Sequence, residues 1–261
     1  MTTTSTTRRT LLRGAAAGAG LTALGTGRAP AAPGPAPGAP PDAADDGPHI
    51  GVLLYDGFSL LDPTGPAEIL ARLPGARVTM IAERRGPVRT DTGDVALVAE
   101  RTTAETSRLD VLLVPGAGER GTVACVENPA LLDWIRRVHR HTRWTTSVCT
   151  GSLILGAAGL LRGLDATTYW ASRDYLENEC GARYLPERYV RAGKIITAAG
   201  VSAGVDMALY LASLMSGDTV AQAIQLAVEY DPRPPFDTGT PDKAGPELRE
   251  LALRLLADSQ T

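Results

Sequence analysis

Cys149 lies in the part of this sequence best suited to nucleophilic chemistry. It follows the short run 144–148 and precedes Thr150, Gly151 and Ser152. This pattern predicts a buried strand that turns sharply into a helix, as at other nucleophile turns. A thiol at such a turn lies near unpaired backbone N–H groups and the positive end of the helix dipole. We therefore expect a lowered pKa for Cys149, with thiolate available at neutral pH.

Two further stretches are expected to meet this turn. Asp62 follows an apolar run at residues 49–55, and Gly116 and Ala117 follow another run at residues 110–115. In open α/β sheets, ligands bind in the crevice beyond the carboxyl ends of the strands. The backbone N–H groups of Thr150, Gly116 and Ala117 are therefore predicted to form an anion-stabilising pocket near the thiol.

The alternative for Cys149 is a buried, unreactive thiol, which is the usual state of a free cysteine. This alternative is stronger for Cys125 and Cys180, because neither follows a predicted strand. A disulfide between these two residues after export is left open. No CxxC pair occurs and the chain has only three histidines, so no metal site is expected.

Strands and helices alternate along the chain from residue 49. The expected strands are residues 49–55, 77–82, 110–115, 144–148 and 194–199. The expected helices are residues 66–73, 151–161, 204–215 and 247–257, with another that opens at Asn128 and Pro129. This order predicts an α/β domain of flavodoxin-like type, a three-layer sandwich with a central, mostly parallel sheet.

The first 48 residues have a different composition. Arg8 and Arg9 stand before a weakly apolar run, which is the pattern of a twin-arginine export signal. We assign residues 1–33 to this signal, 34–48 to a disordered Pro/Ala/Gly linker and 49–261 to the α/β domain. The signal predicts recognition by the twin-arginine export machinery and a periplasmic or extracellular location. The alternative is a disordered basic tail that does not act as an export signal.

Composition narrows the class of partner. The chain has 261 residues, is 44% apolar and carries a formal net charge of −3. Binding to nucleic acid or to an anionic membrane surface needs clustered Lys and Arg, which this balance does not favour. We expect a small-molecule substrate instead.

Four stretches together resemble the isonitrile hydratases of the PfpI-like superfamily, which has a glutamine amidotransferase-like fold. They are the run from Cys149 to Leu161 and residues 61–66, 166–168 and 229–236. The resemblance implies that Cys149 is the nucleophile, Asp62 the proton shuttle beside it, and Thr150 the support of both. It also implies that burial raises the pKa of Asp62. The implied reaction converts a small isonitrile to an N-substituted formamide without metal or organic cofactor, in a homodimer.

Gly116, Ala117 and Gly151 complete the predicted site as residues that bind the substrate or stabilise its anion. One departure concerns Tyr169, because relatives usually carry His there. Tyr169 argues against the members that need a Cys–His dyad, such as the peptidase-like ones, and not against hydration through Asp62.

Three other functions remain as alternatives. The first is a thiol-based stress protein or glyoxalase-like enzyme, which usually has Glu in place of Asp62. The second is a non-catalytic ligand-binding member of the superfamily. The third is a DNA-binding regulator, but the short stretch after Phe236 leaves too little chain for a helix-turn-helix module.

Overall fold

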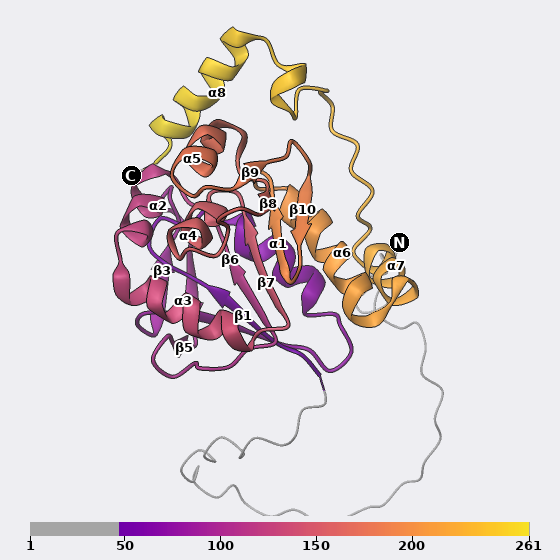
Figure 1. Cartoon of the computed structure of the whole chain (residues 1–261). Helices are drawn as coiled ribbons and strands as arrows, with labels where there is room; N and C mark the ends of the chain where they lie inside the picture. Colours follow the sequence, from indigo (N-terminus) through magenta and orange to yellow (C-terminus); the bar gives the residue numbers. More distant parts are fainter. Residues whose placement is uncertain (1–46, 261) are drawn as a thin grey trace, which may run out of the picture. The chain divides into compact units, whose positions relative to one another are not determined.

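The computed structural model describes residues 47–260, which form an α/β domain around a seven-stranded sheet (Figure 1). Six strands are parallel, and β10 pairs antiparallel with β11 at one edge. In sheet order the strands are β10 (Tyr189–Ala192), β11 (Ile195–Ala198), β7 (Trp144–Val148), β6 (Val111–Val114), β1 (His49–Leu53), β2 (Arg77–Ala82) and β5 (Arg101–Thr102). The predicted fold class is confirmed.

Helices cover both faces of the sheet (Figure 1). One face carries α1 (Leu61–Leu70), α6 (Ala203–Ser216) and α7 (Asp218–Ala227). The other face carries α2 (Glu119–Val126), α3 (Pro129–His141), α4 (Gly151–Ala157) and α5 (Arg173–Asn178). The last helix, α8 (Pro246–Asp258), has no buried residue.

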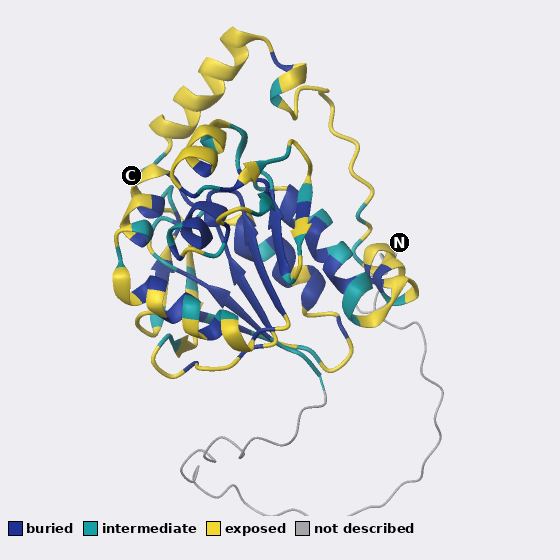
Figure 2. Ribbon diagram, viewed as in Figure 1, coloured by how far each residue is buried: buried dark blue, intermediate teal, exposed yellow. Residues whose placement is uncertain are grey.

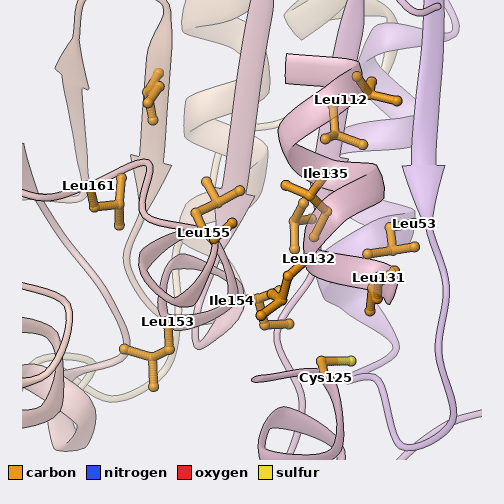
Figure 3. Packing of buried hydrophobic residues seen from close by; sticks show 14 of the residues in the cluster. Leu53, Leu112, Cys125, Leu131, Leu132, Ile135, Leu153, Ile154, Leu155 and Leu161 are labelled. Carbon is orange, nitrogen blue, oxygen red and sulfur yellow. The ribbon is translucent and has the colours of Figure 1, made fainter. Parts of the chain in front are cut away.

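Alternating side chains of the central strands explain these layers. Along β6, Leu112 and Val114 point into the cluster beneath α3 and α4, whereas Val111 and Leu113 join the cluster beneath α1 and α6. All four are fully buried, as the sheet is in Figure 2, and Figure 3 shows the first cluster from close by. A parallel strand that is buried on both faces has apolar side chains at successive positions, which explains the apolar run of β6.

The predicted strands are confirmed to within two residues at each end. The helix predicted to open at Asn128 also begins as expected, because the Asn128 side chain accepts a hydrogen bond from Leu131 N at 3.1 Å. The helix predicted over residues 151–161 ends earlier, at Ala157. Gly159 follows with a φ of +76°, a left-handed conformation that stops the helix.

The helix predicted over residues 66–73 begins earlier, at Leu61. Asp62 and Pro63 therefore lie in its first turn and not in a preceding loop. Proline is tolerated there, because the first N–H groups of a helix have no acceptor within it. This shift matters because it places Asp62 on a helix.

Several elements were not predicted. They are the hairpin of β3 (Gly86–Arg89) and β4 (Ala96–Ala99), the pair β8 (Asp165–Ala166) and β9 (Arg183–Tyr184), the strands β5 and β10, the helices α2, α5 and α7, and two short 3-10 turns, η1 (Trp170–Ser172) and η2 (Pro241–Lys243). The proposed export signal lies outside the described residues, as does the linker apart from Gly47 and Pro48. Within residues 47–260, no helix is long and apolar enough to cross a membrane.

Candidate active site

Cys149 lies at the turn from β7 to α4, as predicted. Its φ is +56°, a left-handed conformation that side chains other than glycine rarely adopt. The hydroxyls of Ser152 and Thr168 donate to its carbonyl oxygen at 3.0 and 3.2 Å, and its N–H donates to Ala199 O at 2.9 Å. Strained conformations persist only where the surroundings hold them, so this one marks a candidate functional site.

Asp62 lies on the first turn of α1 and is completely buried. Its Oδ2 accepts a hydrogen bond from Gly116 N at 2.8 Å. Its Oδ1 has no hydrogen-bond partner within the part of the chain that the structure describes. A buried carboxylate oxygen without a partner is costly for stability, so this atom is available for a bound substrate or a transferred proton.

Gly116 shows how closely the predicted residues meet. A Cβ at residue 116 would lie 2.8 Å from Asp62 Oδ2, 2.8 Å from Cys149 Cβ and 2.7 Å from Thr150 N. Only glycine leaves room at this point. The ends of β6 and β7 and the start of α1 therefore bring Asp62, Cys149 and Thr150 to one place, as the sequence predicted.

Burial raises the pKa of Asp62 from 3.8 to about 7. The hydrogen bond from Gly116 lowers the pKa, and the charge of Asp91 raises it further, but both effects are smaller than the loss of hydration. The expectation of a raised pKa is confirmed. A carboxyl group that titrates near neutral pH can both accept and donate a proton.

The expectation of a lowered thiol pKa is wrong. Burial raises the pKa of Cys149 well above its ordinary value, and the nearby Asp62 charge raises it further. The backbone N–H groups of Thr150 and Val201 and the Thr150 hydroxyl lower it, but by less. Cys149 is therefore held as a neutral thiol, because lost hydration outweighs the hydrogen bonds at the helix start.

The backbone N–H groups that lie near the sulfur are not all those that the sequence predicted. Gly116 N already donates to Asp62, and Ala117 N donates to Thr150 Oγ1 at 2.9 Å. The N–H groups that reach the sulfur belong to Thr150 and Val201. Val201 was missed, although it follows β11 at the same sheet edge. The predicted end of a strand at residue 199 indicated that Val201 would lie at this edge of the sheet, and this indication was not used.

Thr150 links the thiol to the loop after β6. Its hydroxyl donates to Ala117 O at 2.9 Å, accepts from Ala117 N and lies 2.9 Å from Thr122 Oγ1. Ala117 is therefore a support of Thr150 and not a donor to the sulfur. Thr122, on α2, was also not predicted.

Gly151 has a role in packing. A Cβ at this residue would lie 2.2 Å from Val114 O and 2.7 Å from Pro115 O, which is closer than real contacts allow. The missing side chain lets the first turn of α4 pack directly on the end of β6. Gly151 thus places Cys149 beside Gly116, and its own contacts are with backbone.

Tyr169 lies near the thiol, half-buried. Burial raises its pKa, and a negative charge on Cys149 would raise it further. The three histidines lie elsewhere: His49 begins β1, and His139 and His141 lie at the end of α3. No Cys–His dyad is therefore formed by residues 47–260.

Cys125 and Cys180 are both free and buried, and both pack in the apolar cluster beneath α3 and α4. Figure 3 shows Cys125 among the leucine and isoleucine side chains of this cluster. The disulfide that the sequence left open is not formed in the described structure. Among residues 47–260, no group of three or more His, Cys, Asp or Glu side chains is placed to hold a metal ion.

Fold and site together define an α/β protein with a cysteine at a strand-to-helix turn and a carboxyl group beside it. The DJ-1/PfpI family model matches residues 48–214. The chain belongs to the DJ-1/PfpI family.

Individual relatives agree with this assignment. The chain is 43% identical to an isonitrile hydratase of Pseudomonas putida over 80% of its own length and 90% of the relative's. A THiJ/PfpI family protein from Pseudomonas syringae has a similar structure, with a TM-score of 0.76 and 36% identity over 84% of this chain and 93% of that one. Drosophila melanogaster DJ-1beta shares the fold, with a TM-score of 0.64 at 21% identity over 71% of this chain and all of that one.

Proposed function

We propose that this protein hydrates a small isonitrile to an N-substituted formamide, with Cys149 as nucleophile and Asp62 as proton shuttle. The observation that carries the proposal is the fully buried Asp62 carboxyl group beside the thiol, with one oxygen unpartnered and a pKa raised to about 7. The 43% identity to an isonitrile hydratase over most of both chains supports the substrate class.

The first half of the reaction joins substrate and enzyme. The terminal carbon of the isonitrile accepts the sulfur of Cys149, and the same carbon gains a proton. That proton leaves the thiol, passes through Asp62 and reaches the carbon. The product is a thioimidate, in which sulfur, hydrogen and the imine nitrogen share the former isonitrile carbon.

The second half releases the product. Asp62 takes a proton from water, whose oxygen adds to the thioimidate carbon, and the imine nitrogen gains a proton. The tetrahedral intermediate then loses sulfur to give R–NH–CHO, and the thiol recovers its proton. Substrate and one water account for every atom of the product.

The raised thiol pKa fits this scheme. Cys149 begins neutral, so the base must be present in the site when the sulfur attacks. Asp62 as carboxylate supplies that base, and the N–H groups of Thr150 and Val201 stabilise the negative charge that develops on sulfur. Here the thiol is activated during the reaction and not stored as thiolate.

Turnover by the purified full-length chain tests the proposal. With cyclohexyl isonitrile as substrate, mass spectrometry should detect N-cyclohexylformamide. Cys149→Ala should abolish it, whereas Cys125→Ala, which removes an equally buried thiol outside the site, should retain it. Absence of formamide with the parent protein, or full turnover by Cys149→Ala, would contradict the proposal.

We also propose that Arg8 and Arg9 direct the folded enzyme through the twin-arginine machinery. The support is their position before a weakly apolar run. Replacing both by Lys should retain the protein in the cytoplasm, as measured by fractionation and immunoblotting. Replacing Arg13 by Lys is the matched control. Unchanged export of the Arg8/Arg9 variant would refute the assignment.

A further inference from the structure

A hollow of about 710 Å³ lies next to Thr150, the residue after Cys149, and is bounded by α2, η1, the start of α5, and α8. Thr150, which follows the nucleophile, lines its inner end together with Ala117 and Tyr169. Leu153 of α4 adds to its inner lining. The hollow therefore reaches the residues that contact the thiol, and its size is typical of small-molecule sites, which span roughly 300 to 1,000 Å³.

The outer wall of the hollow is the C-terminal helix. Leu253 and Leu256 of α8 line it, whereas Leu251 and Leu255 of the same helix do not. Figure 2 shows α8 as exposed along its length, so these leucines are not held by a core. A helix that keeps apolar side chains two-fifths exposed over an active site is suited to contact a ligand.

The chain directly after α8 packs on the loop that follows β6. The Gln260 side chain packs on Gly118, where a Cβ would lie 2.1 Å from Gln260 Oε1. Gly118 follows Ala117, the residue that holds the Thr150 hydroxyl. Figure 1 shows α8 ending beside α2, the helix that begins directly after Gly118. The chain's end is thus placed against the loop after β6 by a specific contact.

We infer that α8 forms the outer wall of the substrate site and that Leu253 and Leu256 select the substituent carried by the isonitrile. This inference rests on the proposed function. The selected substrates carry a branched or cyclic apolar group about the size of cyclohexyl.

Charge and shape support this substrate class. Apolar side chains from three helices, Val123, Leu153, Leu253 and Leu256, line the hollow, together with the ring of Tyr169. Glu119 and Glu127 are also among the lining residues, and their negative charges disfavour a substituent that is itself anionic. A cyclohexyl group offers these side chains more apolar surface to bury than a methyl group does.

Two double variants of one helix test the inference. Leu253→Ala with Leu256→Ala removes the wall, and Leu251→Ala with Leu255→Ala removes the same residue types from positions that do not line the hollow. For cyclohexyl isonitrile, the first should raise KM about tenfold with kcat unchanged, which corresponds to about 1.4 kcal/mol of lost binding. The second should leave KM unchanged, and methyl isonitrile should not distinguish the two.

A second measurement separates this inference from the proposed function. N-cyclohexylmaleimide and N-methylmaleimide alkylate thiols without hydratase chemistry, so the ratio of their rates at Cys149 reports the hollow alone. The parent should favour the cyclohexyl reagent by about tenfold, and only the Leu253/Leu256 variant should lose this preference. The ratio is measurable even if the parent hydrates no isonitrile, in which case the proposed function fails on its own.

Three results would overturn the inference: equal effects of both double variants, a maleimide ratio that does not change, or loss of a dimer as the only effect of the Leu253/Leu256 variant. Light scattering detects the last of these, which would mean that a second copy of the chain covers α8. Circular dichroism of both variants should match the parent, because all four leucines are exposed.

Discussion

Cys149 and the two cysteines of the apolar cluster differ in their neighbours and hardly at all in burial. Cys149, Cys125 and Cys180 are exposed by only 5%, 3% and 4%. Burial also raises the pKa of every one of these thiols, to about 12 for Cys125 and about 11 for Cys180. Neither quantity therefore distinguishes the predicted nucleophile from the structural thiols.

The surroundings of the sulfur make the distinction. Cys125 lies within α2 and belongs to the apolar cluster that includes Leu131 and Leu132 (Figure 3). Cys149 instead has left-handed backbone, two N–H donors and the buried carboxyl group of Asp62. The difference indicates that reactivity at Cys149 depends on a base within reach during attack, and not on a thiolate already formed.

The largest expected effect tests that base. Asp62→Asn should lower kcat/KM for isonitrile hydration by about 10²- to 10⁴-fold, the usual contribution of a positioned acid–base group. Asn can still accept the hydrogen bond from Gly116 N, so the loop after β6 should keep its position. The measurement is steady-state formamide production, with Asp231→Asn, which changes an exposed carboxyl group, as control.

The pH profile sharpens the same test. Asp62 acts first as carboxylate, so kcat/KM of the parent should rise with pH through about 7 and then level. Asp62→Asn should lose this inflection. A profile that rises only above pH 9 would mean that ionisation of the thiol limits the reaction, and Cys149 would then resemble the other two cysteines.

Most of what brings Asp62 and Cys149 together could be predicted from the sequence. Continuous apolar runs revealed the central strands, and parallel strands must end at one edge of the sheet. The small residues Gly151 and Ser152 were enough to predict the turn after residue 148. The cap of α3 could be predicted for a similar reason, because Asn128 acts on a backbone N–H only three residues away.

The remainder depends on contacts that local patterns do not contain. The raised pKa of Cys149 follows from packing against α1 and α6, which are distant in sequence. The contact of Val201 with the sulfur requires the loop after β11 to fold over the turn. One contact of the chain's end is made by Gln260, which meets Gly118, a glycine far away in the sequence. The apolar periodicity of residues 247–257 predicted α8, but it did not predict which part of the chain lies beside it.

The stability of Asp62→Asn gives the next largest effect. Burial raises the pKa of Asp62 from 3.8 to about 7, so the folded state disfavours its charge. This penalty is absent below pH 3.8, grows as pH rises and is complete above about pH 7. Relative to the parent, Asp62→Asn should therefore gain on the order of 2 to 4 kcal/mol between pH 4 and pH 8.

Urea unfolding of both proteins across this pH range measures the gain. Asp231→Asn again serves as control, because it makes the same substitution at an exposed side chain. Parallel stability curves for Asp62→Asn and the parent would show that the carboxyl group is hydrated in solution. The site of Cys149 would then lack the buried base that separates it from the sites of Cys125 and Cys180.

The smallest effect concerns the backbone and should have opposite signs at two cysteines. At Cys149, where φ is +56°, Gly should be more stable than Ala by about 0.5 to 1 kcal/mol, because left-handed backbone strains every residue with a Cβ. At Cys125, within α2, Ala should be more stable than Gly by about 1 kcal/mol, because glycine weakens helices. Comparing Gly with Ala at each position removes the shared loss of the sulfur, and the free energy of unfolding from urea titration gives both differences. The same sign at both positions would mean that the turn relaxes in solution, and the strained backbone would no longer mark Cys149 as the reactive thiol.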